Sequence, residues 1–157
     1  MPHRLFAMCV SLCVAFAGVM LAANAMASER FAQQLQIQPG LVVVVAEGDF
    51  EARSIGSYAV RVYADPSAIA GNETTFYAAG LVRPRDGFVR SVELLTVAGR
   101  TRPLLMVVIE SAGSGSYLSA EAFAIGPRSV RLLASIDSLA PNEDPALTLR
   151  RKLGSRN

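Results

Sequence analysis

The stretch that decides the fold is an uninterrupted apolar run, Leu41-Val42-Val43-Val44-Val45-Ala46. β-branched side chains fit the pleated surface of a sheet, and a short run without polar residues is typical of a buried strand. Glu47, Gly48 and Asp49 follow directly and supply the residues of a polar turn. A second run of the same kind, Leu104 to Glu110, predicts another central strand.

On either side of these runs, short apolar segments alternate with turn residues, a pattern typical of antiparallel β-structure. In Ser57 to Ala64 the residues alternate, so that Tyr58, Val60 and Val62 share one face of a predicted strand. Further strands are predicted at Glu73 to Arg83, Phe88 to Ala98, Tyr117 to Ile125 and Val130 to Ile136.

Two connections refine this prediction. Pro84 to Gly87 has the Pro and Gly positions of a tight β-turn, which predicts that Phe88 to Ala98 pairs back onto the preceding strand. Near the C-terminus, Asp144 precedes Pro145 as a helix cap, and Ala146 to Leu153 could form a short basic helix closed by Gly154.

The predicted fold class is therefore all-β. No alternation of strands with helices long enough for parallel βαβ units is present in the sequence. Two solid apolar runs among alternating ones fit central and edge strands of a sandwich or barrel. We expect an antiparallel β-sandwich of about seven to eight strands with a short C-terminal helix.

Residues 1–27 have the pattern of a cleavable signal peptide. Arg4 provides a positive start, Leu5 to Ala23 is apolar apart from two residues, and Ala25-Met26-Ala27 offers small residues at the cleavage positions. The apolar stretch is also close to the ~18 to 20 residues of a membrane anchor. The cleavage site favours export and a single domain over residues 28–157, with no membrane association afterwards.

Cleavage before Ser28 removes Cys9, Cys13 and the single histidine, His3. The remaining chain therefore has no His or Cys nucleophile system and lacks the usual zinc ligands, so we expect neither a cofactor nor a metal. It carries 14 Lys and Arg against 13 Asp and Glu, a balance that argues against nucleic-acid binding.

An acidic cluster leaves one enzymatic alternative open. Glu47, Asp49 and Glu51 lie close together, and a carboxylate pair can hydrolyse glycosides. Around Gly48 they more simply form a polar turn, which is the interpretation we favour.

The segment between the predicted strands Leu104 to Glu110 and Tyr117 to Ile125 is rich in small residues. It contains Gly113, Ser114, Gly115 and Ser116 and ends in Tyr117. One interpretation is a flexible hairpin loop whose tyrosine packs at the start of the next strand. The other is a recognition loop, in which small residues enter a narrow cleft, hydroxyls donate hydrogen bonds and the aromatic ring anchors the contact.

Two stretches resemble the periplasmic inhibitors of invertebrate-type (i-type) lysozyme. Residues Glu47 to Tyr58 resemble the first block of that family, and Ser114-Gly115-Ser116-Tyr117 matches its Ser-Gly-x-Tyr motif. The similarity extends over about residues 41 to 139. Inhibitors of chicken-type lysozyme carry a longer motif with glycine before the tyrosine, and Ser116 in this place favours the i-type branch.

The resemblance implies a non-catalytic β-sandwich whose protein partner is an i-type lysozyme. It also implies that Ser114 to Tyr117 form the lysozyme-binding loop, shaped by Gly113 and Gly115. A lysozyme cleft holds two carboxyl groups, and the hydroxyls of Ser114 and Tyr117 are neutral donors suited to them. The alternative is an envelope structural or adaptor domain that binds another envelope protein through a sheet edge. A homodimer is left open.

The protein isolated from the periplasm is predicted to begin at Ser28 and to contain no thiol. Intact mass before and after alkylation tests this, because both cysteines precede the cleavage site. A mass that includes residues 1–27, or any shift on alkylation, contradicts the prediction.

Overall fold

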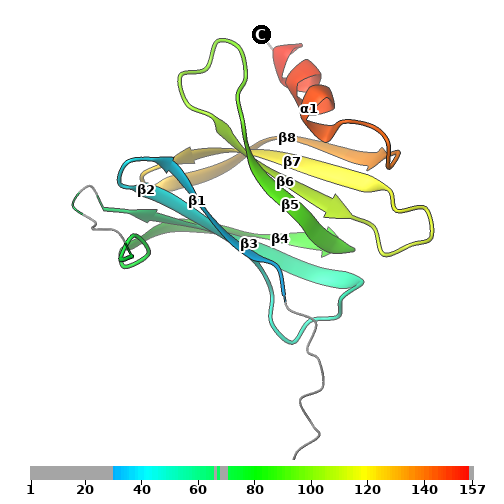
Figure 1. The fold of residues 1–157 in the computed structure, drawn as a ribbon, viewed down its shortest axis with the longest axis horizontal. Helices are drawn as coiled ribbons and strands as arrows, with labels where there is room; N and C mark the ends of the chain where they lie inside the picture. Colours follow the sequence, from blue (N-terminus) through cyan, green and yellow to red (C-terminus); the bar gives the residue numbers. More distant parts are fainter. Residues whose placement is uncertain (1–29, 66, 68–70, 156–157) are drawn as a thin grey trace, which may run out of the picture.

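The computed structural model describes residues 30–65, 67 and 71–155, which form two four-stranded antiparallel sheets. The first sheet contains, in order, β1 (Ala32–Gln38), β2 (Leu41–Glu47), β3 (Ile55–Ala64) and β4 (Tyr77–Asp86). The second contains, in order, β5 (Phe88–Leu95), β6 (Leu104–Glu110), β7 (Leu118–Gly126) and β8 (Ser129–Leu139). One helix, α1 (Pro145–Gly154), follows beside the second sheet (Figure 1). The predicted all-β sandwich with a C-terminal helix is confirmed.

The main core lies between the two sheets. Alternate residues of β2 and β3 point inward, and Val45, Val60 and Val62 have no exposed surface. Val107 and Phe123 face them from the second sheet and are equally buried. Each fully buried side chain of this size contributes roughly 1.5 to 3 kcal/mol relative to exposure, so this layer supplies the main stabilisation.

A second apolar layer lies on the outer face of the second sheet, under α1. Leu149 and Leu153 of the helix belong to this layer together with Met106 and Val108 of β6, and the helix contacts β7 and β8. Because β6 is covered on both faces, the run from Leu104 to Ile109 is buried throughout. The predicted cap is also present, since Asp144 accepts hydrogen bonds from the backbone amides at the start of α1.

The sequence did not predict β1. This edge strand pairs with β2, and its outer residues Gln34 and Gln36 are exposed while Ile37 is buried. Glutamine alternating with single apolar residues gives a weak strand signal, because only one face of an edge strand needs to be apolar.

The predicted tight turn at Pro84 to Gly87 is wrong. β4 continues to Asp86, and Pro84 fits within it because β4 is an edge strand that needs no donor there. Only Gly87 then separates β4 from β5, and the chain crosses to the other sheet. Gly87 has a φ of 109°, and an added Cβ would lie 1.9 Å from the Glu110 carbonyl oxygen. Consequently β5 pairs with β6 and not with β4.

A polar cluster joins the sheets inside the core. The Tyr58 hydroxyl on β3 donates to Glu121 on β7, and Arg83 on β4 donates to the same carboxylate over 2.6 and 3.1 Å. Burial raises the pKa of the Tyr58 hydroxyl, and its hydrogen bond to Glu121 does the same. These three residues fix the relative position of the two sheets, since a buried carboxylate is costly unless its partners are in place.

Among the described residues, no helix is long and apolar enough to cross a membrane. The predicted signal peptide, residues 1–27, lies outside the described residues.

Two neighbouring valines of β2 test which face of this strand points into the core between the sheets. Val45→Asp would bury an unpaired carboxylate between the sheets and should remove most of the ~5 to 15 kcal/mol typical of a domain. Val44→Asp is the control, because Val44 is half-buried on the opposite face and an aspartate there can remain hydrated. Denaturant unfolding followed by circular dichroism measures both. Parent-like unfolding of Val45→Asp would show the assignment to be wrong.

Candidate functional site

The loop of residues 111–117 connects β6 to β7 at the end of the second sheet (Figure 1). The Ser111 amide donates to the Tyr117 carbonyl over 2.9 Å and closes the base of the loop. The Ser116 amide donates to the Gly113 carbonyl over 3.2 Å and forms a turn with Ser114 and Gly115 at its tip. The loop is therefore folded back on itself by backbone hydrogen bonds.

Tyr117 is presented at the surface and does not pack into the core. Its side chain is 54% exposed, and β7 begins one residue later, at Leu118. An added Cβ at Gly115 would lie 2.3 Å from Cε2 of the Tyr117 ring. Gly115 thus allows the ring to lie against the tip of the loop, a contact within the protein that the sequence did not predict.

The other predicted loop residues have different roles. Ser114 and Gly115 are exposed, whereas Ser116 is half-buried and adopts a left-handed φ of 45°. At Gly113 an added Cβ would only reach ordinary contact with the Ser111 hydroxyl at 3.5 Å. Gly113 therefore contributes through its backbone, which accepts from Ser116, and not through the missing side chain.

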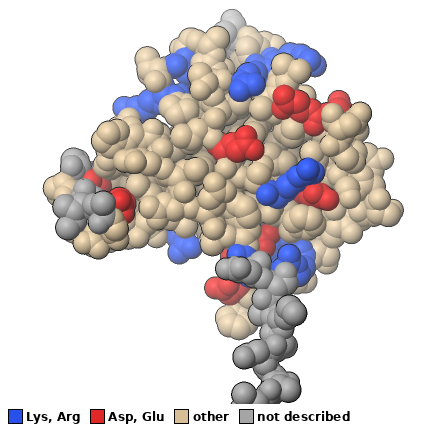
Figure 2. All heavy atoms as spheres, in the orientation of Figure 1, with Lys and Arg blue, Asp and Glu red and all other residues tan. Residues whose placement is uncertain are grey.

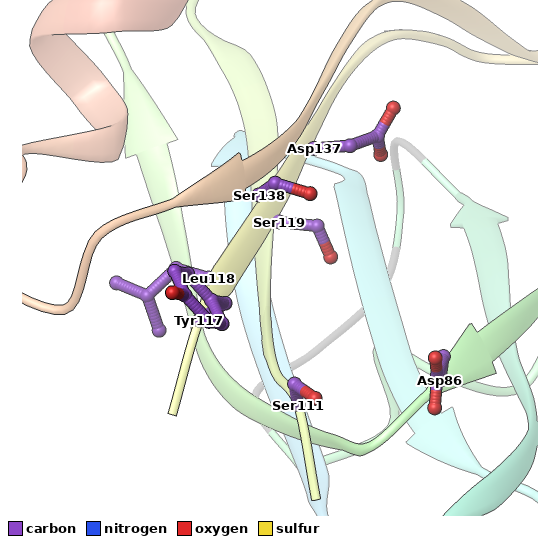
Figure 3. Close-up of a pocket in the computed structure, with 7 residues that line it drawn as sticks. All are labelled: Asp86, Ser111, Tyr117, Leu118, Ser119, Asp137 and Ser138. Carbon is purple, nitrogen blue, oxygen red and sulfur yellow. The ribbon is translucent and has the colours of Figure 1, made fainter. Parts of the chain in front are cut away.

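A pocket of about 500 Å³ lies beside this loop, and Tyr117 forms one of its walls. The remaining lining comes from the ends of β4, β6, β7 and β8, as Figure 3 shows, and consists of Asp86, Ser111, Leu118, Ser119, Asp137 and Ser138. Asp86 and Asp137 give the pocket two exposed carboxylates. Sequence reasoning missed both, because they belong to different sheets and carry no shared motif.

Uncharged side chains cover most of the face seen in Figure 2, and basic side chains gather along its upper edge, near α1. Elsewhere on this face acidic and basic groups are mixed.

The loop of residues 48–54, between β2 and β3, lies at the same end of the sandwich (Figure 1). The fully buried Arg85 side chain holds its second half by donating to the carbonyls of Ala52 and Arg53 over 3.1 and 2.8 Å. Arg85 also lies 3.7 Å from Glu47 and 3.8 Å from Glu51. The residues from Glu47 to Tyr58, which resemble the first block of the family, thus form this loop and the strand ends that hold it.

Glu51 ties the same loop to the start of β3. Its carboxylate accepts from the Ser57 hydroxyl over 2.6 Å and from the Ser57 amide. These hydrogen bonds lower the pKa of Glu51 below its ordinary value of 4.5. An added Cβ at Gly48 or Gly56 would lie within 2.4 Å of this carboxylate side chain, so the two glycines leave room for its present position.

The acidic cluster is structural in this arrangement. Glu47 is buried, where it faces Arg85 and accepts from the Val89 amide over 2.7 Å, and Glu51 is bound to Ser57. Asp49 is exposed on the loop. Among the described residues, no group of three or more His, Cys, Asp or Glu side chains could hold a metal ion.

A two-layer sandwich that presents a small-residue loop ending in an exposed tyrosine has the form of a binding domain. The family described as "PliI: Periplasmic lysozyme inhibitor of I-type lysozyme" matches residues 29–153. The chain belongs to this family. It is accordingly a periplasmic lysozyme inhibitor and not an enzyme, as the sequence predicted.

Two solved structures are similar. One is PliI-Ah, the periplasmic lysozyme inhibitor of I-type lysozyme from Aeromonas hydrophila, at 43% identity with a TM-score of 0.69, covering 76% of this chain and 98% of that one. The other is Aeromonas hydrophila PliI in complex with Meretrix lusoria lysozyme, with the same identity and TM-score, covering 76% of this chain and 95% of that one. No curated protein sequence matches the chain.

Glu51 predicts a dependence of stability on pH. Because its pKa is lowered in the folded state, its stabilising effect is present above the ordinary value of 4.5 and is lost as the pH falls through the lowered pKa. Glu51→Gln should therefore unfold at a lower temperature than the parent at neutral pH, and the difference should disappear at strongly acidic pH. Asp49→Asn, in the same loop, is the control. A difference that stays constant with pH would exclude this role of Glu51.

Proposed function

We propose that this protein inhibits an i-type lysozyme by inserting the loop of residues 111–117 into the substrate cleft. The observation that carries the proposal is the exposed Tyr117 ring, which lies against Gly115 at the tip of a loop closed by its own backbone. A narrow tip with one large aromatic side chain suits a cleft that normally receives a sugar chain.

The hydroxyl groups of the loop support the same interpretation. Within the described part of the chain, no hydrogen bond engages the side-chain hydroxyl of Ser114 or Tyr117, whereas the Ser111 hydroxyl already accepts from the Gly113 amide. Ser114 and Tyr117 can therefore donate to a partner. The catalytic carboxyl groups of a lysozyme are the acceptors that such donors would meet, and hydrogen bonds to charged groups are the stronger kind.

The backbone of the loop favours tight binding. The hydrogen bonds at its base and turn fix its shape before binding, so less conformational entropy is lost in the complex. The missing side chain of Gly115 leaves room for the Tyr117 ring to lie against the loop.

The proposal predicts that Tyr117→Ala weakens inhibition of an i-type lysozyme by about thirtyfold, because a central tyrosine often contributes ~2 kcal/mol or more. Ser114→Ala should cost roughly 1.5 to 3 kcal/mol of binding energy through a lost charge-assisted hydrogen bond. Inhibition constants and unfolding midpoints are measured for each variant.

Tyr77→Ala is the matched control, since Tyr77 is 62% exposed but lies at the start of β4, at the opposite end of the sandwich. It should inhibit like the parent. All variants should unfold near the parent midpoint, because neither loop side chain is buried. If Tyr117→Ala inhibits like the parent, or if its loss of inhibition only follows a loss of folded protein, the loop is not the inhibitory site.

A further inference from the structure

Phe50 is the most exposed large apolar side chain among the described residues. It lies on the 48–54 loop, and its side chain is fully exposed, with a relative exposure of 105%. Its backbone has a left-handed φ of 62°. A bulky residue is an outlier in that backbone region, and burying its ring would be favourable. Neither the backbone conformation nor contacts within the described fold account for a phenylalanine at this position.

The backbone beneath Phe50 is held firmly. The next residue, Glu51, is tied to Ser57 through its carboxylate, and its carbonyl accepts from Arg30. The two residues after that are bound by the buried Arg85 guanidinium. A strained conformation persists only where the surroundings enforce it, and such positions are frequent at binding sites. The loop therefore presents an apolar ring on a fixed base.

The 48–54 loop is continuous with the proposed inhibitory site. Ser54, its last residue, accepts from the Gly87 amide over 2.7 Å, and Gly87 packs directly on the end of β6 where the 111–117 loop begins. Asp86, the residue before Gly87, lines the pocket that Tyr117 walls. Both loops are at the same end of the two sheets in Figure 1.

The size of a stable interface requires contacts beyond a single loop. A standard protein–protein interface uses about 20 to 30 residues on each side, several times the length of the 111–117 loop. Beside that loop, the pocket that Tyr117 walls is lined by Asp86 and by Asp137 and Ser138 of β8. The 48–54 loop comes next, through the hydrogen bond from Gly87 to Ser54.

We propose that Phe50 is a second lysozyme contact, packing on an apolar patch beside the cleft while the 111–117 loop occupies the cleft itself. The inference rests on the proposed function for the orientation of the partner. It assigns to the 48–54 loop a role in affinity that is separate from blocking the catalytic groups.

The test compares Phe50→Ala, Phe50→Gly and Phe76→Ala for inhibition of an i-type lysozyme, dissociation rate and unfolding midpoint. Both Phe50 variants should weaken inhibition at least about tenfold, through faster dissociation, because burial of the ring is lost. Phe76 is the matched control: it is 59% exposed and lies just before β4, at the opposite end of the sandwich. Phe76→Ala should inhibit like the parent.

Phe50→Gly separates a contact made by the ring from a role in shaping the loop. Glycine adopts a φ near 62° without strain, so a purely conformational role predicts that Phe50→Gly still inhibits like the parent. That outcome overturns the proposal, as does an equal loss in Phe76→Ala. A changed oligomeric mass of Phe50→Ala with unchanged inhibition also overturns it, because the ring then contacts a second copy.

Tyr117→Ala, measured alongside, distinguishes this inference from the proposed function. If Tyr117→Ala loses inhibition while both Phe50 variants retain it, the cleft-filling loop stands and the second contact fails. If the Phe50 variants lose inhibition while Tyr117→Ala retains it, lysozyme binds the 48–54 loop but the cleft-insertion proposal fails. Because the two loops are distinct sites, the two losses should add in the double variant.

Discussion

The Arg85 guanidinium is the interaction on which the end of the sandwich depends. It is completely buried and donates to the backbone carbonyls of Ala52, Arg53, Ser57 and Gly87. Its charge is permanent, and the nearby carboxylates of Glu47 and Glu51 balance it. Because an unpaired buried charge is very costly, the segments that meet at Arg85 have one acceptable arrangement. The 48–54 loop and the crossing between the sheets are therefore fixed together.

This frame links the fold to inhibition. Gly87, at the crossing between the sheets, packs against Glu110 and Ser111 at the end of β6. The start of the 111–117 loop is therefore positioned by a glycine that belongs to neither strand flanking the loop. On the outer face of the second sheet, α1 packs on β7 and β8, and β6 lies within the same apolar layer and is buried almost throughout. The loop that leaves β6 thus starts from a rigid support, while its tip remains exposed.

The sequence predicted the strands whose apolar patterns are strong. It failed where the place of a segment in the sheet, at an edge or at a crossing, determines its structure. The runs at Leu41 and Leu104 mark central strands because burial on both faces needs continuous apolar residues. β1 was missed because an edge strand tolerates glutamines, and Pro84 was placed in a turn because the pattern cannot distinguish a hairpin from a crossing between sheets. The small-residue loop was predictable from composition. The neighbouring pocket was not, since Asp86 and Asp137 come together only through the ends of β4 and β8.

The order of the strands also bears on how the chain folds. Every hydrogen-bonded strand pair joins neighbours along the chain, and each sheet is a meander that one half of the chain can build alone. Such local pairing carries a small loop-closure cost and favours rapid formation of each sheet. The contacts between distant parts of the chain are those across the layers, such as Tyr58 with Glu121, 63 residues apart. The two halves of the chain are joined only when the sheets dock, and in that step the Glu121 carboxylate must meet its partners as water leaves.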